Sequence, residues 1–333
     1  MTSEILLSVV VPVYDVEAYL EVCLQSLGLQ LDRRMEVILV DDGSSDDSLA
    51  IARAWARKRV GVRVLAQEHQ GLSAARNRGV GESSGTFLAF CDADDVVPEG
   101  SYRTLLASLQ ETGSDFVSGN VRRFDSSGIW AHPRYGNVFA TDRLRTHITR
   151  DHRLVLDRMA WNKVFRRSFW DRAGLRFALR EYEDASVMIR AHLLADAVDV
   201  LSRVVYHWRV RDFGPRSITQ RLYEPSNIEA RMTMATETGQ VIQSIFPPLL
   251  SAFAADIIHG DFWVLACAAA SHSDEEMYPA TLRANEFVAM RDPDCLMNLS
   301  PDDQELVRRV ADLDIPAIRK LGVTRSQILG GKG

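Results

Sequence analysis

Acidic residues gather at two places in the first hundred residues, each directly after an apolar run. Asp92 and Asp94 follow the run 87–90, and Asp95 comes next. Carboxylate oxygens are the ligands that Mg²⁺ and Mn²⁺ prefer in proteins. Two carboxylates two residues apart can hold such a cation against a departing diphosphate, whose charge the cation neutralises. We therefore predict a Mn²⁺ or Mg²⁺ site at Asp92 and Asp94; the alternative is a turn or helix cap before Pro98.

The second acidic pair, Asp41 and Asp42, follows the strand-like run 36–40 and precedes Gly43 and Ser44. A plain helix start would explain Gly43 as the turn and Ser44 as the cap, but not two acids before them. A carboxylate at the edge of a sheet can accept a hydrogen bond from the N3–H of uracil or thymine. We predict this role for Asp41, with Asp42 as the second candidate.

Both acidic segments belong to a regular alternation of strand-like and helix-like segments from Ser8 to about Gly119. Such alternation predicts an α/β fold, with a mostly parallel central sheet flanked by helices. Ligands of these sheets bind beyond the carboxyl ends of the strands, which is where the acids lie. The expected strands are 9–11, 36–40, 62–65 and 87–90, and the expected helices are 16–27, one opening at 44–47, 72–79 and 101–109.

Polar residues ahead of the first two helices match capping signals. Asp15 precedes the first helical stripe, and Ser44 with Asp47 has the spacing of a capping box. We therefore expect each of these side chains to cap its own helix.

The alternation fades in the second half of the chain. Residues 124–153 indicate loops or short antiparallel strands, strand and helix segments return over 158–211, and the pattern is mainly helical after Pro225. We therefore predict a catalytic domain over residues 1–220 and a helical C-terminal region over 221–333. The apolar segment 257–270 is short and carries two polar residues, so we interpret it as a buried helix.

The composition limits which binding partners and which cellular compartment we expect for this protein. The formal net charge of −6 argues against a general nucleic-acid binder, since phosphates require basic surface. The four cysteines show neither metal-ligand spacing nor a disulfide framework, which indicates buried thiols in a reducing compartment. The first residues have no basic leader or cleavage site typical of a signal peptide. We expect a cytoplasmic protein; acceptor binding, homo-oligomer formation and peripheral contact with the inner face of the plasma membrane stay open for the C-terminal helices.

Four segments in the first 120 residues together resemble the family 2 glycosyltransferases, whose fold is known as GT-A. They read VVVPVY at 9–14, VDDGSSD at 40–46, GLSAARN at 71–77 and FCDADD at 90–95. The resemblance implies transfer of a sugar from a nucleotide diphosphate sugar, with inversion at the sugar carbon. It also implies site roles by position: a nucleotide pocket lined by Pro12, Tyr14, Asp41 and Arg76, ribose or metal contact by Asp92, and metal ligation by Asp94.

In the family, the base that takes the proton of the acceptor hydroxyl belongs to a Glu-Asp pair at the start of a helix. Glu183 and Asp184 match this pair, because helical apolar spacing follows them. A helix N-terminus favours an ionised carboxylate, which suits a general base. We predict Asp184 as the base and Glu183 as the residue that orients the acceptor. Glu181 is a rival acid, and an ordinary helix cap is the alternative.

Two further segments extend the resemblance. The run WNKVFR at 161–166 is similar to one in bacterial polysaccharide and teichoic-acid transferases, and Trp161 is either an acceptor-stacking residue or a core residue. The segments 206–211 and 216–219 resemble a family loop that closes over the diphosphate. There Arg211 and Ser217 would supply positive charge and a hydroxyl to the pyrophosphate. His207 is either a metal ligand or a structural residue.

Together these features predict a metal-dependent inverting hexosyl- or N-acetylhexosaminyltransferase. It would take a sugar from a UDP-sugar and pass it to a carbohydrate or polyol-phosphate acceptor in bacterial cell-surface polymer synthesis. One alternative is a sugar nucleotidyltransferase, but these typically carry a Gly-rich loop with a basic residue after the first strand, and residues 12–15 form no such loop. The other is a nucleotide-sugar-binding module without transfer activity, against which the intact Asp94 and Asp184 argue.

Overall fold

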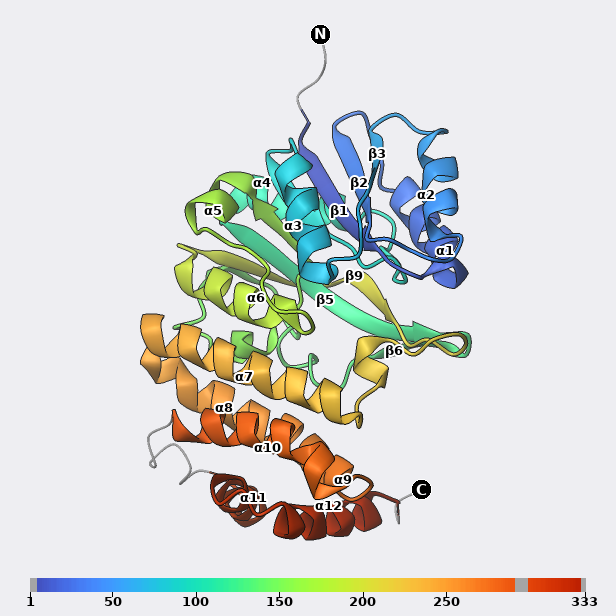
Figure 1. Cartoon of the computed structure of the whole chain (residues 1–333). Coiled ribbons are helices and arrows are strands. Elements are labelled where there is room, and N and C mark those ends of the chain that lie inside the picture. The colour runs from blue at the N-terminus through green and yellow to red at the C-terminus, as the bar shows by residue number, and fades with distance from the viewer. Residues whose placement is uncertain (1–4, 291–298, 331–333) are drawn as a thin grey trace. The chain divides into compact units, whose positions relative to one another are not determined.

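The structure, a computed structural model, describes residues 5–290 and 299–330. The chain divides into two compact units, Met1–Pro215 and Arg216–Gly333. The first unit contains the sheet with its helices, and the elements of the second unit are helical (Figure 1). The predicted α/β class, with a mostly parallel central sheet and a helical C-terminal region, is confirmed.

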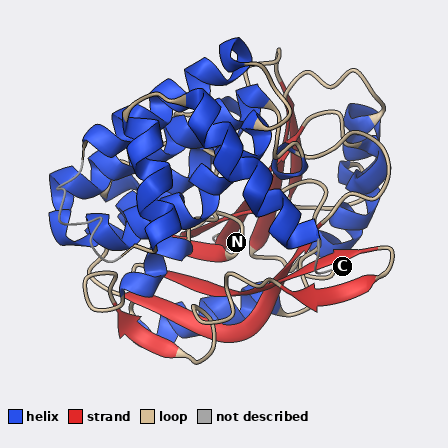
Figure 2. Cartoon of the chain, turned by 90° about the horizontal axis from the view of Figure 1, so that it is seen from below, coloured by secondary structure: helices blue, strands red, loops and turns tan. Residues whose placement is uncertain are grey.

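The described part of the first unit is built on one mixed sheet of nine strands, ordered β3-β2-β1-β4-β8-β5-β9-β7, with β6 paired to β5. Strands β1 to β4 are parallel to one another, and β8 runs antiparallel between β4 and β5. Figure 2 distinguishes these strands from the helices. Their bounds are β1 Leu7–Val13, β2 Met35–Asp41, β3 Val62–Ala66, β4 Phe87–Phe90, β5 Phe116–Asp125, β6 Gly128–Ala131, β7 Arg143–Thr146, β8 Lys163–Arg166 and β9 Val198–Arg209.

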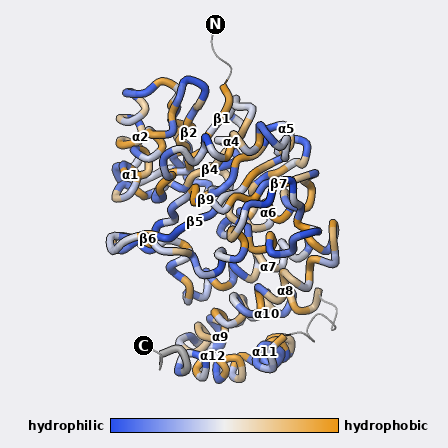
Figure 3. Tube along the Cα trace, turned by 180° about the vertical axis from the view of Figure 1, so that it is seen from behind, coloured by the Kyte–Doolittle hydropathy of each residue, from blue (hydrophilic) through white to orange (hydrophobic). Residues whose placement is uncertain are grey.

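The central strands are apolar along their whole length. Every residue of β1 and of β2 is buried, as expected for parallel strands covered on both faces. Hydrophobic stretches run through the strands, while the helices alternate in hydropathy (Figure 3). The helices of this unit are α1 Glu17–Gly28, α2 Ser48–Ala56, α3 Leu72–Glu82, α4 Ser101–Thr112, α5 Arg167–Arg172 and α6 Glu183–Leu194, with a 3-10 turn η1 at His152–Leu156.

The four strands and four helices predicted before residue 119 all occur at their expected places. The weakly patterned stretch 124–153 forms β6, which runs antiparallel to β5, and β7, which runs antiparallel to β9. These two short strands agree with the interpretation of that stretch as loops and antiparallel strands.

The predicted helix caps were wrong in detail. Neither α1 nor α2 has a side-chain cap from its own N-cap residue, and α2 begins at Ser48, after the expected capping box. The two helix starts instead cap each other. The Val16 N–H donates to Ser48 Oγ at 2.9 Å, and the Asp47 N–H donates to Glu17 Oε2 at 2.8 Å. Asp15 accepts from the Ser45 N–H at 2.7 Å, so its carboxylate stabilises the other loop. Sequence spacing cannot reveal a cap that comes from 30 residues away.

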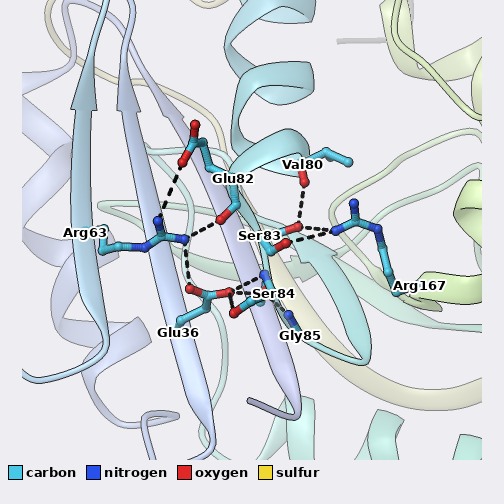
Figure 4. Close-up of polar contacts among 9 residues, drawn as sticks. Glu36, Arg63, Val80, Glu82, Ser83, Ser84, Gly85 and Arg167 are labelled. Atoms are coloured by element: carbon cyan, nitrogen blue, oxygen red, sulfur yellow. Dashed lines mark hydrogen bonds and ion pairs between the residues drawn. The ribbon is translucent and has the colours of Figure 1, made fainter. Parts of the chain in front are cut away.

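A buried glutamate ties the sheet together at the end opposite to the acidic loops. Glu36 Oε1 accepts from Ser8 Oγ at 2.6 Å. The same oxygen accepts from the Ser84 N–H at 2.7 Å, and Oε2 pairs with Arg63 at 3.0 Å, as Figure 4 shows. Burial opposes ionisation, but the hydrogen bonds from Ser8 and Ser84 and the charge of Arg63 lower the pKa of Glu36. One ionised carboxylate therefore links three neighbouring strands to the turn before β4.

The second unit consists of helices. They are α7 Pro225–Ile245, α8 Leu250–Ile257, α9 Trp263–Ala269, α10 Asp274–Ala289, α11 Pro301–Ala311 and α12 Ile315–Gly330, with short 3-10 turns η2 Ile218–Gln220 and η3 Pro247–Leu249 and a π-helical turn η4 Ile258–Phe262. The stretch Pro247–Ala269 is, by length and composition alone, apolar enough to cross a membrane. The core helix of a soluble protein meets the same criteria, and 61% of its most apolar window is buried inside the structure.

Close packing of α3 on the sheet generates a stability prediction. A Cβ added at Gly79 would lie 2.3 Å from Cγ1 of Val10, a β-branched residue held in β1, whereas one added at Gly81 of the same helix meets nothing within 4 Å. We expect Gly79→Ala to lower the free energy of unfolding by about 1–3 kcal/mol through overpacking. Gly81→Ala, the matched control, should be neutral or slightly stabilising because alanine favours helix. Thermal and urea unfolding would measure both; equal stability of the two variants would contradict the packing.

Candidate active site

The carboxyl ends of β1, β2 and β4 lie at one edge of the sheet, since these strands are parallel. Asp41 is the last residue of β2 and pairs in register with Val13 of β1. Tyr14 directly follows β1, Pro12 lies within it and is buried, and Asp92 lies two residues beyond β4. The fold thus brings to one edge the loops that the sequence singled out.

Arg76 connects two of the predicted groups. Its guanidinium, carried by α3 and 2% exposed, donates from Nη2 to Asp92 Oδ1 at 2.6 Å and pairs through Nη1 with Glu183 Oε1. Glu183 is itself buried at the start of α6. Both side chains are engaged in this bridge, which joins the Asp-Ala-Asp loop to the Glu-Asp pair. The nucleotide contact predicted for Arg76 and the acceptor contact predicted for Glu183 stay predictions.

Three carboxylates crowd the loop after β4. Burial and the charge of Asp94 raise the pKa of Asp92, although Arg76 opposes the shift. Burial and the charges of Asp94 and Asp92 raise the pKa of Asp95 well above its usual range. Crowded carboxylates of this kind are relieved by a cation held between them.

The oxygens at this loop fit a hard divalent cation. Arg76 engages one oxygen of Asp92, and Arg211 Nε engages Asp94 Oδ2 at 2.7 Å, so each carboxylate keeps a second oxygen as a ligand. Over residues 5–290 and 299–330 the side chains form no group of three or more His, Cys, Asp or Glu that could hold a metal. A cation here would therefore have two protein carboxylates and take its other ligands from water or phosphate.

The end of β9 and the residues just after it contact the same loop. The Arg209 N–H donates to Asp95 Oδ1 at 2.7 Å, and Arg211 makes the contact with Asp94 given above. Arg209, which the sequence analysis missed, also stacks its guanidinium 4.3 Å from the ring centroid of Phe124. Arg211 thus lies beside the predicted metal ligand. Ser217 belongs to the second unit, where its hydroxyl and Gln220 form the capping box of η2, and its pyrophosphate role stays a prediction.

The two acids at the end of β2 have different environments. Asp42 is saturated: Oδ1 accepts from Gln67 Nε2 at 2.6 Å and Oδ2 from the Gly71 N–H at 2.8 Å. Asp41 is 1% exposed and uses only Oδ2, which accepts from the N–H groups of Gly43 and Ser44 at 3.3 Å. Its Oδ1 is buried and has no hydrogen-bond partner in the described residues. Asp42 therefore organises the loop before α3, and Asp41 keeps a buried acceptor.

An aromatic pair lies beside these acids. Tyr14 is 47% exposed and stacks on His69 with ring centroids 4.3 Å apart, and His69 Nδ1 lies 2.9 Å from Asp42 Oδ2. Sequence reasoning missed His69, whose only signal is its place in the loop after the third strand. The stacked rings form a partly exposed flat surface beside Asp42, the residue after Asp41.

Asp184 lies at the first turn of α6, as predicted. Burial raises its pKa; the charge of Arg76 opposes the shift, and the charge of Asp92 adds to it. The Ala160 N–H donates a hydrogen bond to this carboxylate and favours its ionised form. Asp184 therefore lies close enough to Asp92 and Arg76 for their charges to set its protonation. The Asp-Ala-Asp loop and the Glu-Asp pair, which the sequence analysis predicted separately, therefore lie near each other.

The loop that holds Ala160 is fixed by a buried ion pair that the sequence analysis missed. Lys163 Nζ lies 2.5 Å from Asp157 Oδ1, and His192 Nε2 lies 3.2 Å from Oδ2, all fully buried. Burial opposes ionisation of Asp157, but Lys163 and His192 hold its pKa well below its usual range. This pair positions the backbone that contacts Asp184.

The structure bears on the roles of Trp161 and His207, for which the sequence left two alternatives each. Trp161 is 5% exposed and stacks on Tyr206 with centroids 4.3 Å apart, so it is a core residue here and presents no free face to an acceptor. His207 forms a backbone bridge with Val96 at the end of the strand that borders the loop after β4. The structure therefore favours a core role for Trp161, and a metal contact of His207 stays a prediction.

The Arg76 bridge yields a prediction. Arg76→Met would leave Asp92 and Glu183 without their cation, and breaking such a buried pair costs about 3–5 kcal/mol. Adding Glu183→Gln should recover part of that loss, because one of the two buried charges is removed. Arg78→Met, on an exposed position of the same helix, is the control. Thermal unfolding of the wild type, Arg76→Met, Glu183→Gln, the double variant and the control would measure the coupling. Strictly additive effects of Arg76→Met and Glu183→Gln would show that the two residues do not depend on each other.

Comparison with known proteins agrees with this geometry. A family model described as glycosyl transferase family 2 matches residues 8–180. EpsJ of Bacillus subtilis, described as an uncharacterized glycosyltransferase, is 30% identical over 226 residues, which are 66% of this chain and 65% of EpsJ. The match thus covers less than two thirds of that relative's length.

Two solved structures share the fold. S. aureus TarS 1-349 in complex with UDP-GlcNAc has a TM-score of 0.76 at 19% identity, and the match covers 97% of this chain and 92% of the TarS 1-349 chain. The mannosyltransferase PcManGT from Pyrobaculum calidifontis, in complex with GDP-Man and Mn²⁺, has a TM-score of 0.57 at 16% identity and covers 95% of this chain and 86% of PcManGT. Since the family model spans more than half of the sequence, the chain belongs to glycosyl transferase family 2.

Proposed function

We propose that this protein transfers a sugar from a UDP-sugar to an acceptor hydroxyl, with inversion at the sugar carbon and with the help of Mn²⁺ or Mg²⁺. The observation that carries the proposal is the Arg76 bridge. It holds the Asp-Ala-Asp loop and the Glu-Asp pair in one site, so that a donor diphosphate and an acceptor base can act on the same sugar. Membership of family 2 supports the reaction class.

The base-binding end is proposed at Asp41 and Tyr14. The buried Oδ1 of Asp41 is an acceptor without a partner in the described residues, and the N3–H of uracil is a donor that would satisfy it. The exposed Tyr14 ring, backed by His69, offers a surface on which a flat base can stack. The UDP-GlcNAc complex of TarS supports uridine as the nucleoside.

The diphosphate is proposed to lie at the loop after β4. Asp94 and Asp92 would hold the divalent cation, which when bound neutralises charge on the leaving diphosphate. Arg211 and Ser217 are proposed to add a positive charge and a hydroxyl donor to the pyrophosphate. The Mn²⁺ in the PcManGT complex supports a metal in this fold.

The transfer step follows from these positions. Asp184 takes the proton of the acceptor hydroxyl, whose oxygen then forms a bond to the anomeric carbon from the face opposite the diphosphate. The bond from that carbon to the phosphate oxygen breaks, its electron pair stays with the oxygen, and UDP leaves. Glu183 acts through Arg76 by keeping the base and the diphosphate loop in register. The product is a glycoside of inverted configuration and one UDP.

The biological setting is proposed from the family resemblance. The sugar would be a hexose or an N-acetylhexosamine, and the acceptor a carbohydrate or a polyol phosphate of a bacterial cell-surface polymer. Such donors are made inside the cell, so the proposed location is the cytoplasm, with peripheral membrane contact or homo-oligomer formation as proposed roles of the C-terminal helices.

Two substitutions would separate the proposed roles. In a thermal-shift screen of UDP, GDP, CDP and their sugars with Mn²⁺, we expect UDP compounds to stabilise the wild type most, since stabilisation follows affinity. Asp94→Asn should abolish the Mn²⁺-dependent part of that shift. Asp184→Asn should keep the shift but lower UDP release from the donor by about 10²–10⁴-fold, as expected for loss of a general base. Asp47→Asn, an exposed acid near the same edge, is the control.

Each outcome bears on one role. Equal UDP affinity with Mn²⁺ and with a chelator in the wild type would reject the metal. Undiminished UDP release by Asp184→Asn would reject the base. Nucleotide binding without any UDP release would instead favour the binding module considered above.

The raised pKa of Asp184 predicts the pH dependence. The base must be ionised to accept a proton, so activity falls as pH drops through the pKa of Asp184. Since burial and Asp92 raise this pKa, the acid limb should lie above the usual aspartate range of about 4. Rates of UDP release at saturating Mn²⁺ between about pH 4 and pH 8 would locate the limb, with circular dichroism to verify folding. A rate that stays constant down to the ordinary aspartate range would contradict the shift.

A further inference from the structure

Four side chains form a basic and aromatic surface that the proposed mechanism does not use. Arg123 of β5 pairs in register with Trp208 of β9, and its guanidinium carbon lies 4.5 Å from the centroid of the Trp208 ring. His132 stacks on Tyr135 at 4.1 Å and on Trp208 at 5.6 Å. We name these residues, Arg123, His132, Tyr135 and Trp208, the Arg123 platform. The β5–β6 hairpin that carries part of it is seen in Figure 1.

The Arg123 platform borders the proposed base. Trp208 contacts Trp161 at 5.7 Å, and Trp161 follows Ala160, whose N–H is bonded to Asp184. On the other side, Tyr135 is close enough to Asp184 for that carboxylate to contribute to the raised pKa of its phenol, although burial is the largest cause. An acceptor whose hydroxyl reaches Asp184 would therefore pass over these rings.

The platform has an excess of positive charge. Burial, then Arg123 and Arg134, lower the pKa of His132 to about 4, so the ring is neutral near pH 7 and its Nδ1 accepts from the Arg134 N–H at 3.2 Å. Burial lowers the pKa of Arg123, against a weaker opposing effect of Tyr135, and no carboxylate is among the causes. The positive charges of Arg123 and Arg134 therefore lower the pKa of the neighbouring His132.

Arg123 also has an unused donor. Its Nε–H is buried and has no hydrogen-bond acceptor within residues 5–290 and 299–330. A buried guanidinium N–H without an acceptor is destabilising, and an anionic oxygen supplied by a ligand would satisfy it. The fork of a guanidinium matches phosphate and carboxylate oxygens, while aromatic rings pack against the carbons of a sugar or polyol.

We infer that the Arg123 platform binds an anionic group of the acceptor, a phosphodiester or a carboxylate, next to the hydroxyl that receives the sugar. The inference rests on the proposed function and narrows it, because it favours a polyol phosphate or an acidic glycan over a neutral carbohydrate. Arg123 holds the charge of the acceptor, and the half-buried rings of Trp208 and Tyr135 border that position.

The test uses the full chain in the absence of a sugar donor. Fluorescence anisotropy would measure binding of three labelled probes: a glycerol-phosphate oligomer, an oligogalacturonate and a neutral maltooligosaccharide. We expect at least one anionic probe to bind more tightly than the neutral one and to be displaced by inorganic phosphate. The anionic probe that binds tells whether the group is a phosphodiester or a carboxylate.

The variants assign that binding to the platform. Arg123→Gln should weaken the anionic probe about tenfold, the loss expected for one charge-assisted contact. Arg122→Gln is the matched control: it removes the same charge from the adjacent residue of β5, which pairs with His207 on the other face of the strand, and should change affinity little. Arg123→Lys keeps the charge without the fork and should give an intermediate affinity, which also covers the case of an unfolded Arg123→Gln.

Three results would overturn the inference: a neutral probe that binds as tightly as the anionic ones, an Arg123→Gln affinity equal to wild type, or equal losses from Arg122→Gln and Arg123→Gln. Stabilisation by UDP with Mn²⁺ is measured separately and should be the same in Arg123→Gln as in wild type. Failure of UDP to stabilise the wild type would defeat the proposed function, whereas the anion measurements need no donor.

Discussion

The site depends on one buried guanidinium. Arg76 lies between Asp92 and Glu183, on a helix that packs against β1, and the three side chains come from the loop after β4, from α3 and from the start of α6. A charge at this depth is stable only when it is paired. The bridge therefore fixes the distance between two segments that are about 90 residues apart in sequence and gives them a common electrostatic field.

Hydrogen bonds and ion pairs at this edge of the sheet hold the backbone around the Arg76 bridge in place. The starts of α1 and α2 cap each other, Asp42 gathers the N–H groups before α3, and the Asp157–Lys163 pair fixes the backbone near Asp184. Each device satisfies buried polar groups that would otherwise be costly. Asp41 Oδ1 and Arg123 Nε are among the buried polar atoms of the described residues that have no hydrogen-bond partner, and ligands are proposed to bind at these two.

Similar acids acquire different roles through their surroundings. Asp42 is saturated by hydrogen bonds, Asp41 keeps a buried acceptor, and Asp92 is balanced between an arginine and a neighbouring carboxylate. Asp184 lies farther along the chain, but the charges of Arg76 and Asp92 also shift its pKa. Composition cannot separate these residues; the number of donors around each carboxylate does, because every donor stabilises the ionised form and uses up an acceptor.

The order of strands, helices and acidic loops before residue 119 was determined by the sequence itself, since hydrophobic periodicity and polar strand ends are local signals. The position of Asp184 at the start of a helix was predictable for the same reason, because the helical spacing that follows it is a local signal. Contacts between distant segments were decided only by the tertiary structure: the reciprocal caps replaced the expected capping box, stacking on Tyr206 placed Trp161 in the core, and Arg76, which the sequence assigned only to the nucleotide pocket, bridges Asp92 and Glu183. Those outcomes depend on which side chains meet across the sheet, and no spacing along the chain records that.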